Sequence, residues 1–171
     1  VRPIEEALRE VGLPYVVIGG MAFFDRKEVK DLLAYLRLCQ NPRDEISLRR
    51  IINYPTRGIG VSSLDRLDEE AKAKGISLYE AAAAAARGEV ASLPPKAAGA
   101  LVGFVELIER YRARFVAGEL LGPASELVEE LKLREDVFKN QDDAVLGHRK
   151  AENLDDLLES IQRFSARRAR D

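Results

Sequence analysis

Apolar residues recur at helical spacing along most of this chain. From residue 21 onwards they follow the i, i+3, i+4 rhythm that places them on one face of a helix. On one such face we expect Val29, Leu32, Leu33, Leu36 and Cys39. The pattern predicts helices over about residues 25–40, 44–53, 63–74, 77–86, 95–117, 124–131 and 154–164. The fold class is therefore expected to be mainly α.

Capping signals mark the start of two of these helices. Asp25 with Glu28, and Ser77 with Glu80, match the capping box in which two polar side chains satisfy the first backbone N–H groups of a helix. Gly75 is expected to end the helix before Ser77.

The second half of the chain carries further punctuation. Pro94–Pro95 is expected to begin the longest helix, and Gly118 with Gly122–Pro123 to end it. Residues 140–150 are polar, and we expect a loop there.

The pattern before residue 21 is different. Residues 3–11 have helical spacing, and Pro14 to Ile18 form a continuous apolar run of the kind found in strands inside parallel sheets. Since no second strand pattern follows, we expect one helix and one orphan strand from an α/β domain. Gly19 and Gly20 come next, and they are open to two interpretations, a hinge or an ordinary loop.

Composition excludes several kinds of site. The single cysteine, Cys39, rules out an internal disulfide and a cysteine-based metal cluster, and His148 has no metal-ligand spacing around it. The sequence has neither a glycine-rich phosphate loop ending in Lys-Ser or Lys-Thr nor a Ser/His/Asp set. We expect no catalytic residue, no metal and no cofactor in this segment. Without a membrane span or signal peptide in the sequence, the expected location is the cytoplasm.

Charge is distributed unevenly. The net charge is −2, yet residues 23–66 hold nine basic against six acidic side chains. A locally basic segment in an acidic chain is typical of a module that contacts phosphates with one face. Lys27, Lys30, Arg49 and Arg50 are candidates for such a face, although an ordinary solvated helix surface explains them equally well.

Residues 53–64, Asn-Tyr-Pro-Thr-Arg-Gly-Ile-Gly-Val-Ser-Ser-Leu, predict a tight corner between two helices. Pro55 is expected to stop the first helix, and Ser62 or Ser63 to cap the second. Between them, Gly58 and Gly60 flank Ile59, whose side chain is expected to point inward. Both glycines are expected to adopt backbone conformations that other residues cannot. The N–H groups of the corner and the helix dipole favour an anion, and Arg57 would add a mobile positive charge. The alternative is a corner whose glycines serve turn geometry alone.

Three motifs resemble one family. Residues 14–38 (PYVVIGGMAFFDRKEVKDLLAYLRL), residues 53–60 (NYPTRGIG) and the later Glu152-Asn153-Leu154 with Phe164 resemble, in order and spacing, the UvrD/Rep/PcrA family of superfamily 1 DNA helicases. The resemblance covers most of the chain. It implies that residues 1–20 are the tail of the 2A motor subdomain with a Gly19–Gly20 hinge. It implies that residues 21–171 are the helical 2B regulatory subdomain, with a helix-hairpin-helix-like Gly-Ile-Gly corner.

The same resemblance implies a role. The corner would contact the backbone of duplex DNA through Thr56, Arg57, Gly58, Ile59, Gly60, Ser62 and Ser63. The whole helicase would use ATP and Mg²⁺, bound outside this segment. Partners would be the remaining helicase subdomains and a possible DNA-repair protein. A competing hypothesis is a protein-interaction or autoinhibitory module with little DNA affinity of its own.

Overall fold

The computed structural model describes residues 21–139 and 144–168, which form nine α-helices and no strand. The mainly α prediction is confirmed for this part of the chain. The expected helix over residues 3–11, the strand over residues 14–18 and the Gly19–Gly20 hinge lie outside the described residues. The helices are α2 (Met21–Phe24), α3 (Lys27–Gln40), α4 (Glu45–Ile51), α5 (Val61–Lys74), α6 (Leu78–Ala86), α7 (Pro95–Val116), α8 (Leu121–Glu130), α9 (Leu133–Lys139) and α10 (Ala144–Arg168).

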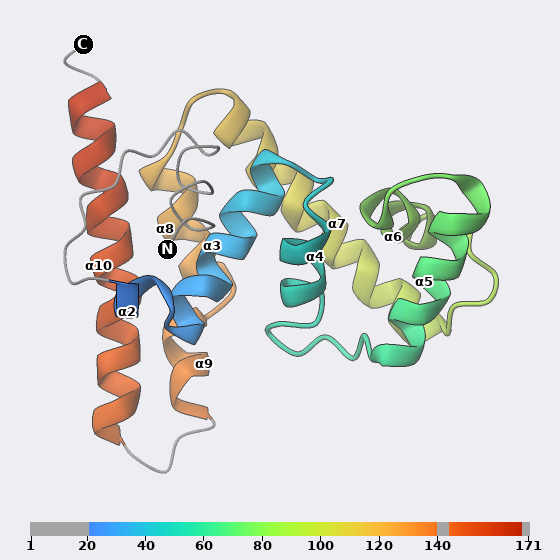
Figure 1. Ribbon diagram of the computed structural model, residues 1–171, viewed down its shortest axis with the longest axis horizontal. Helices are drawn as coiled ribbons and strands as arrows, with labels where there is room; N and C mark the ends of the chain where they lie inside the picture. The colour runs from blue at the N-terminus through green and yellow to red at the C-terminus, as the bar shows by residue number, and fades with distance from the viewer. Residues whose placement is uncertain (1–20, 140–143, 169–171) are drawn as a thin grey trace.

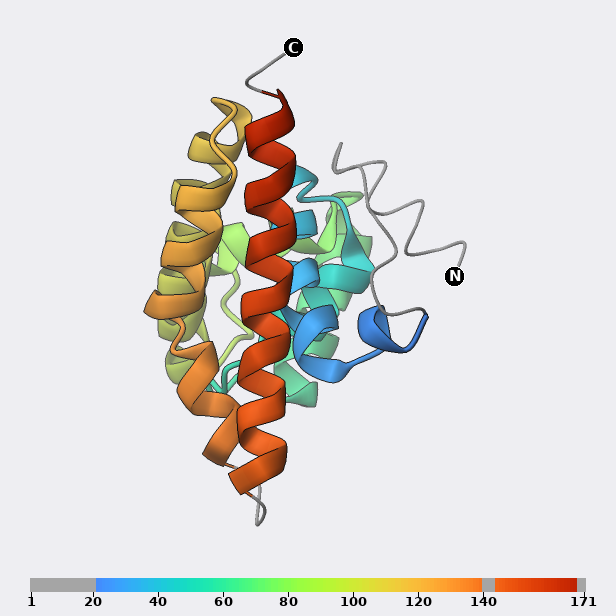
Figure 2. The ribbon, with the colours of Figure 1, turned by 90° about the vertical axis from the view of Figure 1, so that its left-hand side faces the viewer.

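Helix α7 links two groups of helices. It runs obliquely across the molecule, with α4, α5 and α6 near its first half and α3 and α8 beside its second half, while α9 and α10 lie farther out on that side (Figure 1). Helix α10 stands alongside α8 and α9 (Figure 2). The largest fully buried side chains include Tyr35 of α3, Phe104 and Ile108 of α7, and Leu127 of α8, so one core joins these elements.

The predicted inner face of α3 is confirmed, but its capping box does not form. The N-cap is Arg26, which makes no side-chain cap hydrogen bond. Asp25 instead pairs with Lys30 at 2.9 Å. Glu28 is buried, and its carboxylate accepts a 2.5 Å hydrogen bond from the amide of Asn153 in α10. The Glu28 carboxylate therefore bonds to a residue distant in the sequence and not to the backbone at the start of α3, because a buried carboxylate requires a donor.

The second expected capping box forms as predicted. Ser77 and Glu80 bond reciprocally to each other's backbone N–H groups at the start of α6. Gly75 ends α5 in a left-handed conformation, also as predicted. The alanine run that follows is packed rather than solvated, since Ala81 and Ala82 are fully buried and α6 lies against α7.

Two boundaries in the second half were predicted wrongly. Helix α10 begins at Ala144, inside the expected loop, and its 25 residues exceed the 22 of α7. Its first turn holds Val145 and Leu146, but both are exposed, so these apolar residues form no buried stripe and the helical rhythm is weak there. Gly122 and Pro123 lie in the first turn of α8, where a proline is tolerated, so Gly118 alone follows the end of α7.

None of the helices in residues 21–139 and 144–168 has the length and the apolar content that crossing a membrane requires.

Candidate nucleic-acid interface

In the corner between α4 and α5, one glycine, Gly58, adopts a backbone conformation that favours glycine. Gly58 has φ +82°, a backbone conformation that residues other than glycine rarely adopt. Gly60 has φ −88° and ψ 179°, which any residue can adopt, so the prediction of a special conformation there was wrong. Ile59 is 1% exposed and anchors the corner in the core, as predicted. The two glycines on either side of it are exposed.

The backbone amides of the corner fall into two sets, those bonded to the side chain of Asn53 and those without an acceptor in the described residues. The side-chain oxygen of Asn53 accepts hydrogen bonds from the N–H groups of Arg57, at 2.9 Å, and Ile59, at 3.1 Å. These two amides are thereby turned toward the protein. Other amides of the corner find no acceptor among the described residues; they belong to the exposed residues Gly58, Gly60, Val61 and Ser62.

Helix α5 adds its own N-terminus to this surface. Its N-cap is Gly60 rather than Ser62 or Ser63, and the Gly60 carbonyl accepts from the N–H groups of Ser63 and Leu64, each at 3.1 Å. Ser63 is buried behind the turn, whereas Thr56 and Ser62 are exposed beside it. The positive end of the helix dipole and the open amides therefore coincide, an arrangement that favours an anion.

Arg57 points into the protein, and its guanidinium is held by hydrogen bonds rather than free at the surface. Its guanidinium lies 5.2 Å from the centre of the Phe104 ring and donates to the Tyr35 hydroxyl at 2.6 Å. It also donates to carbonyls that close the end of α4, those of Ile51 at 3.0 Å, Tyr54 at 2.9 Å and Pro55 at 3.2 Å. Burial raises the pKa of Tyr35 to about 12, although Arg57 opposes this shift. The Arg57 side chain thus holds the corner against α3 and α7.

The candidate basic residues on α3 and α4 form ion pairs with acidic residues of the same molecule. Lys30 pairs with Asp25 at 2.9 Å. Lys27 and Arg50 both bind the buried carboxylate of Asp31, at 2.9 and 2.7 Å. These ion pairs compensate a carboxylate that would be costly to bury alone.

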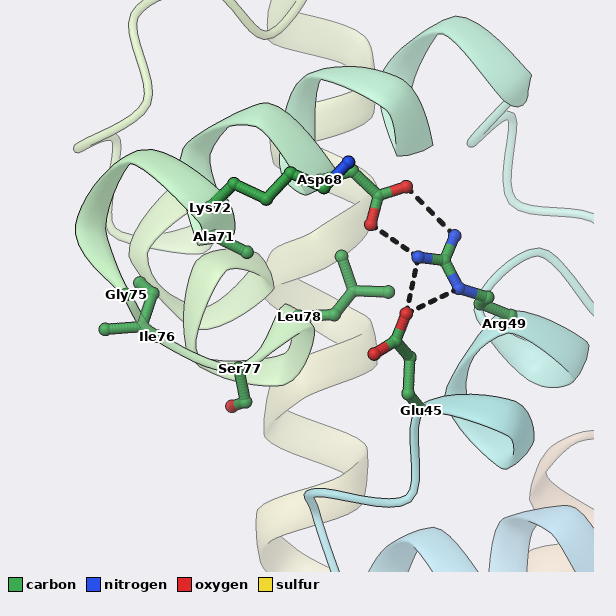
Figure 3. Close-up of a pocket in the computed structure, with 9 residues that line it drawn as sticks. All are labelled: Glu45, Arg49, Asp68, Ala71, Lys72, Gly75, Ile76, Ser77 and Leu78. Carbon is green, nitrogen blue, oxygen red and sulfur yellow. Dashed lines mark hydrogen bonds and ion pairs between the residues drawn. The ribbon is translucent and has the colours of Figure 1, made fainter.

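Arg49 is used in the same way. It lies between Glu45, at 2.6 Å, and Asp68 of α5, and so ties α4 to α5 (Figure 3). Hydrogen bonds to these two carboxylates raise its pKa. An open cavity beside it is lined also by Lys72, Ser77 and Leu78. The structure does not unite Lys27, Lys30, Arg49 and Arg50 into a free basic face.

Sequence reasoning missed one cation at the corner. Lys96, in the first turn of α7, has its side chain next to Gly58. A Cβ atom built on Gly58 would be 3.4 Å from the Cε atom of Lys96. Lys96 follows a segment without a recognisable motif and is far from Gly58 in the sequence, so no local pattern could have placed it there.

Protein metal sites are built mainly from the side chains of His, Cys, Asp and Glu. Residues 21–139 and 144–168 contain no cluster of His, Cys, Asp and Glu suited to a metal ion. Cys39 is buried, and burial raises the pKa of its thiol to about 12.

Residues 1–89, more than half of the chain, match the family of the UvrD-like helicase C-terminal domain. The chain belongs to this family. The matched segment includes α2 to α6 and the whole corner between α4 and α5. The resemblance seen in residues 14–38 and 53–60 is confirmed at the level of the family.

Curated relatives extend the UvrD-like similarity over nearly the whole chain. The ATP-dependent DNA helicase UvrD1 of Mycobacterium tuberculosis is 38% identical over 168 residues, 98% of this chain. The ATP-dependent DNA helicase PcrA of Bacillus subtilis is 35% identical over 95% of the chain, and DNA helicase II of Escherichia coli is 34% identical over 96%. The chain spans about a fifth of these relatives, 21% of the first two and 22% of the third.

Proposed function

We propose that this chain is a segment of an ATP-dependent DNA helicase and serves as its duplex-contacting regulatory part. Family membership and helicase relatives along almost the full chain support this proposal. Residues 1–20 would end the 2A motor subdomain, and residues 21–171 would form the 2B subdomain. ATP and Mg²⁺ would be bound by the rest of the protein. The remaining helicase subdomains would be its partners, and a DNA-repair protein would be a further one.

The observation that carries the DNA contact is the set of open amides at the start of α5. Exposed N–H groups of Gly58, Gly60, Val61 and Ser62 have no acceptor in the described residues, and they coincide with a helix N-terminus. Phosphate oxygens are strong acceptors that such a surface favours. Since phosphates carry no base information, the contact would be independent of sequence and would weaken with salt.

The proposed role also includes a swivel about Gly19 and Gly20. The link between α3 and α10 supports it, because a swivelling body must move as a unit. The amide of Asn153 in α10 donates to Glu28 at 2.5 Å, and the guanidinium of Arg26 donates to the Asn153 side-chain oxygen. The start of α3, which follows the proposed hinge, is thereby fixed to the last helix.

Fluorescence anisotropy with the chain tests the DNA contact. Duplex, single-stranded and junction DNA would be titrated over a range of salt with wild type, Gly60→Glu and Gly60→Ala. A Cβ on Gly60 would meet nothing within 4 Å, so both variants should fold. We expect Gly60→Glu to weaken duplex binding by about tenfold or more through charge repulsion, and Gly60→Ala to change it by about twofold at most.

Two outcomes would contradict the proposal. Failure of wild type to bind duplex or junction DNA at low salt would remove the phosphate contact and favour the protein-interaction hypothesis. Equal binding by Gly60→Glu and wild type would place the contact elsewhere on the chain. Circular dichroism of each variant would confirm that any loss of binding is not a loss of fold.

A further inference from the structure

We propose that Lys96 is a second phosphate contact of this interface, so that the DNA backbone is held by two elements, the α4–α5 corner and the start of α7. The inference rests on the proposed DNA contact and extends it to a residue that neither the motifs nor the family match includes, since the match ends at residue 89. It predicts a bipartite site of backbone amides and one ammonium group.

The first argument is position. Lys96 lies in the first turn of α7, and its side chain runs along the exposed Gly58. Its Cε would be 3.4 Å, and its Nζ 4.0 Å, from a Cβ built on Gly58. The ammonium group therefore lies beside Gly58, a residue whose amide has no acceptor in the described residues, and in the proposed interface one phosphate group contacts both.

The second argument is that this ammonium has no acidic partner among the described residues. Within residues 21–139 and 144–168, no carboxylate lies within ion-pair distance of Lys96. The contrast is with Lys27, Lys30, Arg49 and Arg50, each of which is paired with an acid. A lysine that is exposed and unpaired keeps its charge available for an external anion.

The third argument concerns Gly58. Its φ of +82° favours glycine at this turn, and a Cβ built there would be in ordinary van der Waals contact, at 3.4 Å, with the Cε atom of Lys96. The lysine side chain therefore packs directly against the turn that presents the open amides. Because an ammonium group is a point charge without a fixed fork of donors, the added contact would carry no sequence preference.

The test compares two lysines. Lys72, near the end of α5, is exposed and also lacks an ion pair within the described part of the chain, so Lys72→Gln removes the same charge far from the corner along α5. Binding of the chain to a labelled duplex would be measured by anisotropy from low to moderate salt for wild type, Lys96→Gln, Lys96→Glu, Lys72→Gln and Gly60→Glu. Both lysine sites are exposed, so the variants should fold, and circular dichroism would confirm it.

Lys96→Gln is expected to weaken duplex binding about three- to tenfold at low salt and to reduce the slope of log affinity against log salt by about one, since one phosphate contact is lost. Lys96→Glu should weaken binding further, and Lys72→Gln should leave affinity and slope close to wild type.

Each adverse result has a distinct meaning. Wild-type affinity and slope in Lys96→Gln, together with a loss of binding in Gly60→Glu, would overturn the role of Lys96 and leave the proposed DNA contact standing. Equal effects of Lys96→Gln and Lys72→Gln would also overturn it, because the lysine would then contribute only to net charge. Absence of duplex binding by wild type would overturn both proposals.

Discussion

The α4–α5 corner and the basic residues of α3 and α4 make an instructive pair. Both were candidates for a phosphate contact, although an ordinary solvated helix surface explained the basic residues equally well. In the corner, exposed amides of residues 58 and 60–62 lack acceptors in the described structure. On α3 and α4, Lys27, Lys30, Arg49 and Arg50 each bind an acid of the same molecule. Unsatisfied donors therefore distinguish the two surfaces better than charge does.

The difference has a physical origin. Long basic side chains can reach carboxylates on their own or a neighbouring helix, and Arg49 reaches both Glu45 and Asp68. The N–H groups at the start of a helix have no such freedom, since the helix geometry itself leaves them without partners. A count of charges along residues 23–66 could not reveal which of these groups would be used internally.

The largest expected effect in this comparison is on stability, at Arg57. Arg57→Ala would remove the donor to the Tyr35 hydroxyl and to the Pro55 carbonyl. It would also remove one of two donors to each of the carbonyls of Ile51 and Tyr54. We expect the free energy of unfolding to fall by about 3 kcal/mol, a size typical of breaking a partly buried hydrogen-bond network. Urea denaturation would measure it, with Arg43→Ala as the control, because Arg43 is exposed and its side chain has no hydrogen bond or ion pair within residues 21–139 and 144–168.

If Arg57→Ala kept full stability and lost only DNA affinity, Arg57 would be a direct phosphate contact, as the sequence first indicated. The difference between the corner's inner and outer faces would then disappear.

Much of the fold follows from local rules that nothing overrides. The apolar rhythm of α3 and α4 predicted the buried positions Val29, Leu32 and Leu48 correctly. Ser77 with Glu80 gave the start of α6, and Gly75 the end of α5, because both signals act within one turn of the backbone. The corner itself was located from Pro55, Gly58 and the inward Ile59.

What could not be predicted depends on contacts between distant residues. Glu28 accepts a hydrogen bond from Asn153 in α10 in place of the expected capping contact, and Lys96 of α7 lies beside Gly58. Arg57 has the residue type expected at a phosphate, yet its direction is set by Tyr35 and Phe104, which no local pattern reveals. The apolar residues Val145 and Leu146 at the start of α10 are exposed, and they do not continue into a helical stripe that would identify this segment as a helix.

A smaller effect separates the two glycines of the corner. Gly58→Ala places a side chain at φ +82° and against Lys96, and should lower the free energy of unfolding by about 1.5 kcal/mol. Gly60→Ala has an ordinary φ and open space, so its expected cost is about 0.5 kcal/mol, from a poorer N-cap residue. Thermal unfolding of the two variants against wild type would measure both values. Equal costs would show that Gly58 is not held in the left-handed region.

The smallest expected effect is at Arg49, which represents the paired basic residues. Its side chain is 39% exposed, and ion pairs of this kind contribute about 0–1 kcal/mol, so Arg49→Gln should destabilise the chain by no more than that. The loss should shrink at 1 M salt, where charges are screened within about 3 Å. Its duplex affinity should stay within about twofold of wild type, with an unchanged salt slope, since no phosphate contact is removed. Anisotropy and urea denaturation on the same samples would measure both effects. A slope reduced by about one would mean that Arg49 leaves Glu45 and Asp68 to bind DNA, and that the ion pairs of α3 and α4 are a reserve of phosphate contacts rather than a fixed part of the fold.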